Sequence, residues 1–199
     1  MVAAANDPKI MEYLVNPFAL ANGFTGPEQP AGNQPYFDEA LNSWSAPFIM
    51  ATINTKNIHR SNALLDHLYG KDFVYDEMIL TGPGEQGEKM ANFVANDKSL
   101  AGKDAPKPGE GPSKEERENG NYDIMFIAEE NEKQVIASVG GHLDPGYGST
   151  SKMLTESAMC LAFDDLATLG GIYTPAPAMG EALIKRLIDN AGLYFKIEK

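Results

Sequence analysis

The stretch 144–153, Asp-Pro-Gly-Tyr-Gly-Ser-Thr-Ser-Lys-Met, holds residue types that suit a charged ligand. Gly146 and Gly148 let the backbone approach a ligand, and a helix starting here would present unpaired N–H groups at its positive end. Ser149 and Lys152 would add donors for an anionic group. The alternative is structural: Asp-Pro-Gly forms a turn and a serine or threonine caps the helix. The stretch predicts either an anion-binding helix start or a capped turn.

A second polar cluster occupies residues 54–62. Lys56 and Arg60 would lie one turn apart on a helix, with His59 and Ser61 adjacent in sequence. The planar fork of Arg60 suits a carboxylate or phosphate ligand. The alternative is that Arg60 pairs with one of the many surface carboxylates.

Two tyrosines and one cysteine complete the candidates for chemistry. Tyr75 and Tyr147 carry hydroxyl groups that can donate a proton to a carbanion or oxyanion. Cys160 lies in an apolar helical stretch, which is typical of a packed thiol rather than a nucleophile. The three histidines show no metal-ligand spacing. The sequence therefore predicts no metal site and leaves the catalytic residues unassigned.

One long helix over residues 45–69 is expected to carry the second cluster. Apolar residues recur along it at helical spacing, but Thr55 and Asn62 share their stripe. Such a semi-polar face either lines a cavity or bonds backbone carbonyls. The competing interpretation is a buried strand over 48–53 followed by a helix from Thr55.

The other elements indicate an α+β fold, with a mainly antiparallel mixed sheet covered by helices on one face. Two alternating runs joined by a short polar turn predict a hairpin over 122–140. Residues 1–43 are expected to form a short helix and an irregular wrapping segment, residues 101–113 a loop, and residues 44–199 one domain. Further helices are expected at 8–15, 88–96, 150–169 and 174–192, a capping box at 113–116, and strands at 72–80 and 193–198.

Composition excludes several functional classes. The 199 residues are 43% apolar and carry a net charge of −12, which argues against nucleic-acid binding and a polybasic membrane surface. A single cysteine excludes an intrachain disulfide, so a cytoplasmic location is expected. Neither a signal peptide nor a membrane span is predicted. The first forty residues contain no Gly-rich nucleotide turn after an apolar strand.

Several blocks resemble the saccharopine dehydrogenase-like oxidoreductases, and within them the branch of trans-acting enoyl reductases. The blocks occur in the family's order over about residues 40–195. They include Trp44-Ser-Ala-Pro-Phe-Ile-Met50, Tyr69-Gly-Lys-Asp-Phe-Val-Tyr75, Pro108-Gly-Glu-Gly-Pro-Ser113, Asp144-Pro-Gly-Tyr-Gly-Ser-Thr-Ser-Lys-Met153 and Gly170-Gly-Ile-Tyr-Thr-Pro175.

The resemblance implies a substrate-side, C-terminal domain of an NAD(P)-dependent oxidoreductase that lacks its N-terminal Rossmann domain. No cofactor is then expected on this chain alone, and the Rossmann domain would be supplied in cis or in trans. A small acyl or amino-acid-like substrate and a homodimer are expected. The alternatives are a non-catalytic dimerisation or regulatory module and a standalone anion or acyl-ligand binder. The expected substrate-binding wall consists of Arg60, Ser61, Tyr75, Asp144, Tyr147, Ser149 and Lys152.

Overall fold

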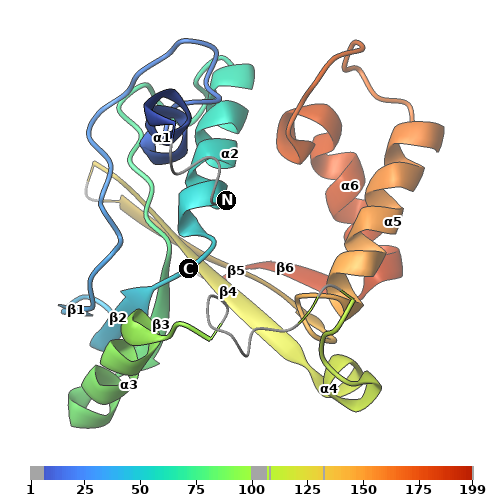
Figure 1. Ribbon diagram of the computed structural model, residues 1–199. Helices are drawn as coiled ribbons and strands as arrows, with labels where there is room; N and C mark the ends of the chain where they lie inside the picture. Colours follow the sequence, from blue (N-terminus) through green and yellow to red (C-terminus); the bar gives the residue numbers. More distant parts are fainter. Residues whose placement is uncertain (1–6, 100–106, 108, 132, 199) are drawn as a thin grey trace. The chain divides into compact units, whose positions relative to one another are not determined.

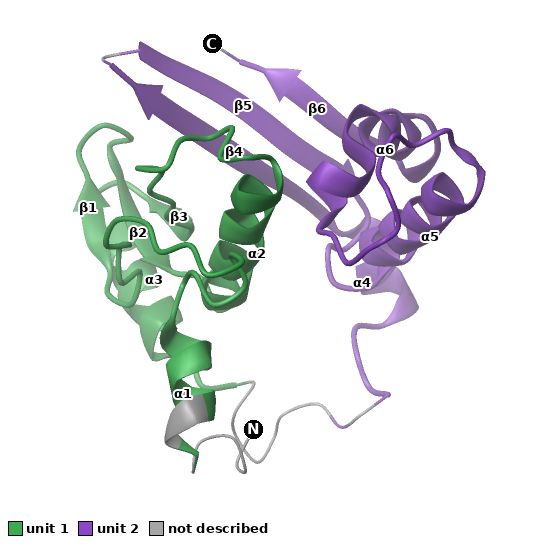
Figure 2. Ribbon diagram, turned by 90° about the horizontal axis from the view of Figure 1, so that it is seen from above, with its two compact units in different colours: residues 1–105 green, residues 106–199 purple. Residues whose placement is uncertain are grey.

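The computed structural model, drawn in Figure 1, describes residues 7–99, 107, 109–131 and 133–198. The chain forms two compact units, Met1–Ala105 and Pro106–Lys199, coloured separately in Figure 2. The division falls inside the Gly- and Pro-rich stretch 101–113, much of which lies outside the described residues. Within the described residues, no helix is both long enough and apolar enough to span a membrane.

Unit 1 is built on a small antiparallel sheet of order β1-β2-β3. Its strands are β1 (Tyr36–Asp38), β2 (Ser43–Pro47) and β3 (Met78–Gly82), and its helices are α1 (Pro8–Val15), α2 (Ala51–Leu64) and α3 (Gly84–Asn96). Helix α3 packs on β2 and β3, where a Cβ on Gly87 would lie 1.9 Å from the Gly82 carbonyl oxygen. Only glycine allows this close approach.

The long helix expected over 45–69 is wrong. Strand β2 occupies its first residues, because Ser45 and Ala46 are buried in the middle of the sheet, between β1 and β3. Helix α2 therefore starts at Ala51, and it ends at Leu64 before Asp66 and His67, both of which have positive φ. The competing expectation of a strand over 48–53 is also wrong, because residues 51–53 are helical.

Two further expectations for unit 1 need correction. Residues 73–77 have no regular secondary structure, so the strand expected over 72–80 is present only as β3, which starts at Met78. The side chain of Gln29 takes the place of a neighbouring strand, since it donates to the Phe73 carbonyl and accepts from the Tyr75 N–H. Residues 36–38, inside the segment expected to be irregular, form β1.

Unit 2 contains a second antiparallel sheet, of order β4-β5-β6. Strands β4 (Asn121–Glu130) and β5 (Lys133–His142) form the predicted hairpin with unbroken register, and β6 (Leu193–Ile197) pairs with the other edge of β5. The predicted capping box is confirmed at α4 (Lys114–Asn119), where Ser113 and Glu116 bond each other's backbone N–H. The α+β class is thus confirmed, with the strands divided between two sheets.

The core of unit 2 lies between two helices and β6. Helix α5 (Gly148–Phe163) packs on α6 (Pro175–Ala191), which starts after Thr174 and ends at Gly192 in the left-handed conformation. Helix α5 stops six residues before its expected end, where Asp164 forms a bidentate ion pair with Arg186 of α6. The buried residues of this apolar cluster are Cys160, Met179, Leu183, Leu187, Ala191 and Leu193.

Candidate functional site

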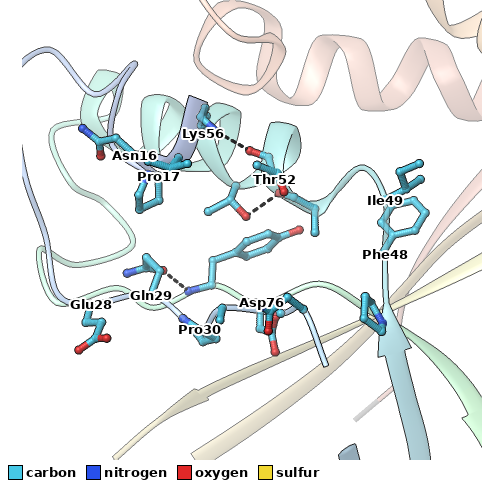
Figure 3. Close-up of a pocket in the computed structure, with 18 of the residues that line it drawn as sticks. Asn16, Pro17, Glu28, Gln29, Pro30, Phe48, Ile49, Thr52, Lys56 and Asp76 are labelled. Carbon is cyan, nitrogen blue, oxygen red and sulfur yellow. Dashed lines mark hydrogen bonds between the residues drawn. The ribbon is translucent and has the colours of Figure 1, made fainter. Parts of the chain in front are cut away.

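Unit 1 contains an open cavity of about 740 Å³, shown in Figure 3. Its walls come from the irregular segment 15–33, the first half of α2 with the turn before it, residues 75–76 and the end of α3. Apolar groups include Pro17, Pro30, Phe48 and Ile49. The polar lining includes Gln29, Thr52, Thr55, Lys56, Tyr75 and Asp76.

Helix α2 supplies the polar face expected from its sequence stripe. Thr55 donates to the Ala51 carbonyl at 2.7 Å, and Lys56 Nζ donates to the Thr52 carbonyl at 2.8 Å. Of the two polar residues of that stripe, Thr55 lines the cavity and bonds the backbone as well. Asn62 bonds the backbone of Gly70 and Tyr69 and does not line the cavity. Burial lowers the pKa of Lys56. An ammonium group has three donors, so this bond leaves donors for a ligand.

Tyr75 is the only one of the seven expected wall residues that lines this cavity. Its hydroxyl donates to Glu77 Oε2 at 3.3 Å, and Asn54 holds the other oxygen of that carboxylate at 2.9 Å. Burial and the charge of Glu77 raise the pKa of Tyr75 far above its usual value. The hydroxyl is therefore protonated at neutral pH but, bonded in this way, is a weak acid.

Arg60 and Ser61 bind the protein's own backbone. Arg60 donates to the Leu20 carbonyl at 2.9 Å and to the Asn22 side chain, which ties α2 to the N-terminal segment. Ser61 is buried and donates to the Asn57 carbonyl at 2.8 Å. These contacts give both residues structural roles, and neither lines the cavity.

In unit 2 the start of α5 is closed by Asp144. Its carboxylate accepts from the N–H groups of Tyr147 and Gly148, at 2.7 Å each. Although burial acts in the opposite direction, hydrogen bonds from Gly148, Tyr147 and Gly146, with the charge of Arg117, lower the pKa of Asp144. The geometry favours the capped-turn interpretation, with the aspartate rather than a serine or threonine as the capping side chain.

The three other wall residues of unit 2 lie in different environments. Ser149 is fully buried and shares a 2.8 Å hydrogen bond with the Tyr122 hydroxyl. Tyr147 is exposed, and its ring lies next to Gly111. Lys152 is exposed on α5. The seven expected residues thus divide between the units, three in unit 1 and four in unit 2.

The α5 start does not fit the pyrophosphate of a dinucleotide. The N–H groups that would bind phosphate already bond Asp144, and phosphate charges would face that carboxylate. The described residues also contain no group of three or more acidic, histidine or cysteine side chains placed to hold a metal ion.

Gln29, Glu77 and Thr52 were missed by sequence reasoning. Gln29 lies in an irregular segment and reaches a backbone 46 residues away, and no local pattern signals such a contact. Of these three residues, only Thr52 could have been predicted, because it lies one helical turn before Lys56 on α2.

Comparison with known proteins finds relatives along nearly the whole chain. "Putative trans-acting enoyl reductase Rv2449c" of Mycobacterium tuberculosis is 35% identical, over 92% of this chain and 50% of the relative. Proteins named trans-acting enoyl reductase from Mycobacterium ulcerans and Mycobacterium bovis are 32% and 30% identical, each over 94% of this chain and 51% of the relative. No family model matches the chain, and no solved structure matches it significantly.

The chain spans about half the length of the curated relatives it matches. An identity of 30–35% along more than nine-tenths of the chain indicates common ancestry with that half. The chain is therefore related to the trans-acting enoyl reductases.

Proposed function

We propose that this chain is the substrate-side half of an NAD(P)-dependent enoyl reductase of the saccharopine dehydrogenase-like type. The observation that carries the proposal is the match over 92–94% of the chain to only about half of each relative. The nicotinamide cofactor is bound by a Rossmann domain, in cis or in trans. This division accords with the closed α5 start, which does not fit a dinucleotide.

The cavity of unit 1 is the proposed substrate site. Its apolar walls suit the acyl part of an unsaturated thioester, and Lys56 is the cationic donor beside them. Lys56 would bond the thioester carbonyl oxygen, on which negative charge develops as the carbon–carbon double bond is reduced. Tyr75, held by Glu77, forms part of the wall.

A complementation experiment tests the division of labour. The full chain is mixed with the segment of the Mycobacterium tuberculosis relative that lies outside the match, and NADPH oxidation is followed with a trans-2-enoyl thioester. We expect no saturable NADPH binding by the chain alone, and a complex with turnover in the mixture. Neither complex nor turnover in the mixture would overturn the proposal, as would tight NADPH binding by the chain alone. The added segment by itself is the control.

A matched pair of lysine variants tests the cavity. In the complemented system Lys56→Met is expected to lower kcat/KM about tenfold, because a charged hydrogen bond contributes about 1.5 kcal/mol or more. Lys71→Met removes an exposed charge from the same unit, outside the cavity, and is the control. Equal effects of the two variants would remove the cavity from the proposal.

The remaining expectations stay proposals. A cytoplasmic location accords with the single cysteine. The homodimer is what the resemblance implies. The non-catalytic dimerisation module is the alternative function, and it is favoured by the exposed apolar side chains of unit 2, among them Leu161, Phe163 and Ile172.

A further inference from the structure

The cavity of unit 1 has a polar end and an apolar end. At the polar end, Lys56 Nζ donates to the Thr52 carbonyl at 2.8 Å. The apolar end is formed by Phe48 and Ile49, before α2, and by residues 94–95 in the last turn of α3. Figure 3 shows the side chains of Phe48 and Ile49 together and well apart from Lys56. A ligand that fills the cavity therefore meets a cation at one end and hydrocarbon at the other.

The fold of unit 1 brings the two apolar segments together. Pro47, the last residue of β2, pairs with Met78, the first residue of β3. Helix α3 begins at Gly84, beyond the other end of β3, and turns back to pack on both strands. Its last turn, residues 94–95, therefore comes to the end of β2 from which the chain continues into Phe48. The apolar end is a feature of the folded unit and not of one stretch of sequence.

The apolar end leaves hydrocarbon surface that a ligand can cover. Ile49 is 67% exposed although it lines the cavity. Asp97 also lines the cavity, but its two carboxylate oxygens accept from the Ser99 N–H at 2.8 Å and from the Ser99 hydroxyl at 3.0 Å. Removing apolar surface from water is favourable. An uncharged hydrocarbon group is therefore the complement of this end.

Several polar side chains of the lining are bonded to the protein itself. Gln29 accepts from the Tyr75 N–H, and the Tyr75 hydroxyl donates to Glu77. Thr55 donates to a carbonyl of its own helix. Among the described residues that line the cavity, Lys56 alone is cationic, and its ammonium group has more donors than its one bond to the backbone uses. Lys56 is thus the group of the lining best able to hold the polar part of a ligand.

We propose that the cavity binds a medium- or long-chain acyl thioester, with the carbonyl at Lys56 and the hydrocarbon tail on Phe48, Ile49 and the last turn of α3. This inference rests on the proposed function and adds the length and the orientation of the substrate. Phe48 precedes Thr52, whose carbonyl holds Lys56, by about one helical turn, a span of about 5.4 Å. Because a carbon–carbon bond is about 1.5 Å long, a chain of about six carbons or more is needed to start at Lys56 and cover the apolar end.

Binding of acyl-pantetheine thioesters to the full chain tests the dependence on length. Isothermal titration calorimetry measures Kd for saturated butyryl, hexanoyl, octanoyl and decanoyl chains, the weak ligands by competition against the decanoyl thioester. We expect Kd to fall about threefold for each added methylene group, because each one covers more of the apolar end. Equal Kd values for the butyryl and decanoyl thioesters, or no binding of the decanoyl thioester, would overturn the proposal.

A matched pair of isoleucine variants tests where the tail lies. Ile49→Ser is expected to raise Kd for the decanoyl thioester about tenfold and to leave Kd for the butyryl thioester unchanged. Ile53→Ser is the control, because Ile53 is 55% exposed on α2 and does not line the cavity. Lys56→Met is expected to raise Kd by the same factor at every chain length, since it acts on the carbonyl end. Far-UV circular dichroism checks that each variant is folded.

Two results would overturn the orientation of the chain. One is an equal effect of Ile49→Ser and Ile53→Ser on the decanoyl thioester, and the other is an Ile49→Ser effect as large on the butyryl thioester. The binding measurements need neither NADPH nor the complementing segment, so they fail separately from the proposed function. In the complemented mixture, equal kcat/KM for crotonyl and trans-2-decenoyl thioesters would overturn the inference about chain length and leave the proposed reductase activity standing.

Discussion

The two units reach stability by different routes. The most buried residues of unit 1 include polar ones, His59, Ser61 and Asn62, set among short strands and a long irregular segment. The core of unit 2 is apolar and lies on one face of α6, with Leu183 and Leu187 against Cys160 of α5. Unit 1 therefore depends on particular hydrogen bonds, and unit 2 on side-chain packing.

The difference extends to the surfaces that each unit exposes. In unit 1 the irregular segment forms part of the wall of a cavity that has both apolar and polar lining, and Gln29 bonds the backbone of residues 73 and 75. Unit 2 pairs its backbone regularly but leaves apolar side chains uncovered on β4 and at the end of α5. Unit 1 is thus the better candidate for a small ligand, and unit 2 for a protein surface.

The largest effect is expected in the core of unit 2. Leu187→Ala removes a side chain that is only 8% exposed and should lower the free energy of unfolding by about 3 kcal/mol. The control is Ile188→Ala, which changes the next residue of α6, a side chain that is 46% exposed. It should lower the free energy of unfolding by about 1 kcal/mol or less. Urea denaturation measures both. Equal losses would contradict a core confined to one face of α6.

A polar counterpart tests unit 1. Asn62 donates to the Gly70 carbonyl at 2.8 Å and accepts from the Tyr69 N–H at 2.9 Å. Asn62→Ala leaves both of these backbone groups without their hydrogen bond and should lower the free energy of unfolding by about 2 kcal/mol. Asn57→Ala is the control, because it removes an exposed side chain that donates only to the Ile53 carbonyl of its own helix. It should lower the free energy of unfolding by about 0.5 kcal/mol or less. If Asn62→Ala were as mild as Asn57→Ala in urea denaturation, unit 1 would not depend on its buried polar bonds.

Local signals explain which elements could be predicted from the sequence. The capping box at Ser113, the β4–β5 hairpin and the ends of α6 at Thr174 and Gly192 each depend on residues close together in the chain. The helix expected over 45–69 was wrong because burial of Ser45 between two other strands is a tertiary effect.

The candidate site was less predictable for the same reason. Tyr75 was predicted because its residue type suggested chemistry. Gln29 was missed because it accepts a hydrogen bond from the Tyr75 N–H, which lies 46 residues away in the sequence. Asp144 was singled out, but its carboxylate faces the N–H groups of its own helix start. A glycine-rich helix start does not reveal from sequence alone whether a ligand or a side chain occupies it.

Acid should affect unit 2 through the ion pair between its helices. The bidentate bond from Arg186 lowers the pKa of Asp164 from 3.8 to about 2. Because the folded-state pKa is the lower one, this stabilisation is present above about pH 4 and is lost as pH falls toward 2. The stability difference between wild type and Arg186→Met should therefore be constant from pH 7 to 5 and shrink below pH 4. Lys185→Met, which removes an exposed pair with Asp189, is the control.

The smallest effect, expected nearer neutral pH, belongs to unit 1. His59 packs between Phe18 and Phe73, with ring centroids 4.4 and 5.8 Å away, and its Nε2 is buried without a partner among the described residues. Burial lowers the pKa of His59 below 6.5. As pH falls below 6.5, the unfolded chain binds a proton that the folded chain does not, so stability declines toward the folded-state pKa.

Replacing that histidine by an aromatic ring of similar size isolates the effect. His59→Phe should keep the packing, remain within about 1 kcal/mol of wild type at pH 7, and lose less stability than wild type between pH 7 and 5.5. His142→Phe replaces an exposed histidine at the end of β5 and should leave the wild-type slope unchanged. Urea denaturation at each pH measures the slopes. A His59→Phe slope as steep as that of wild type would assign the pH dependence to other groups and leave His59 with a packing role alone.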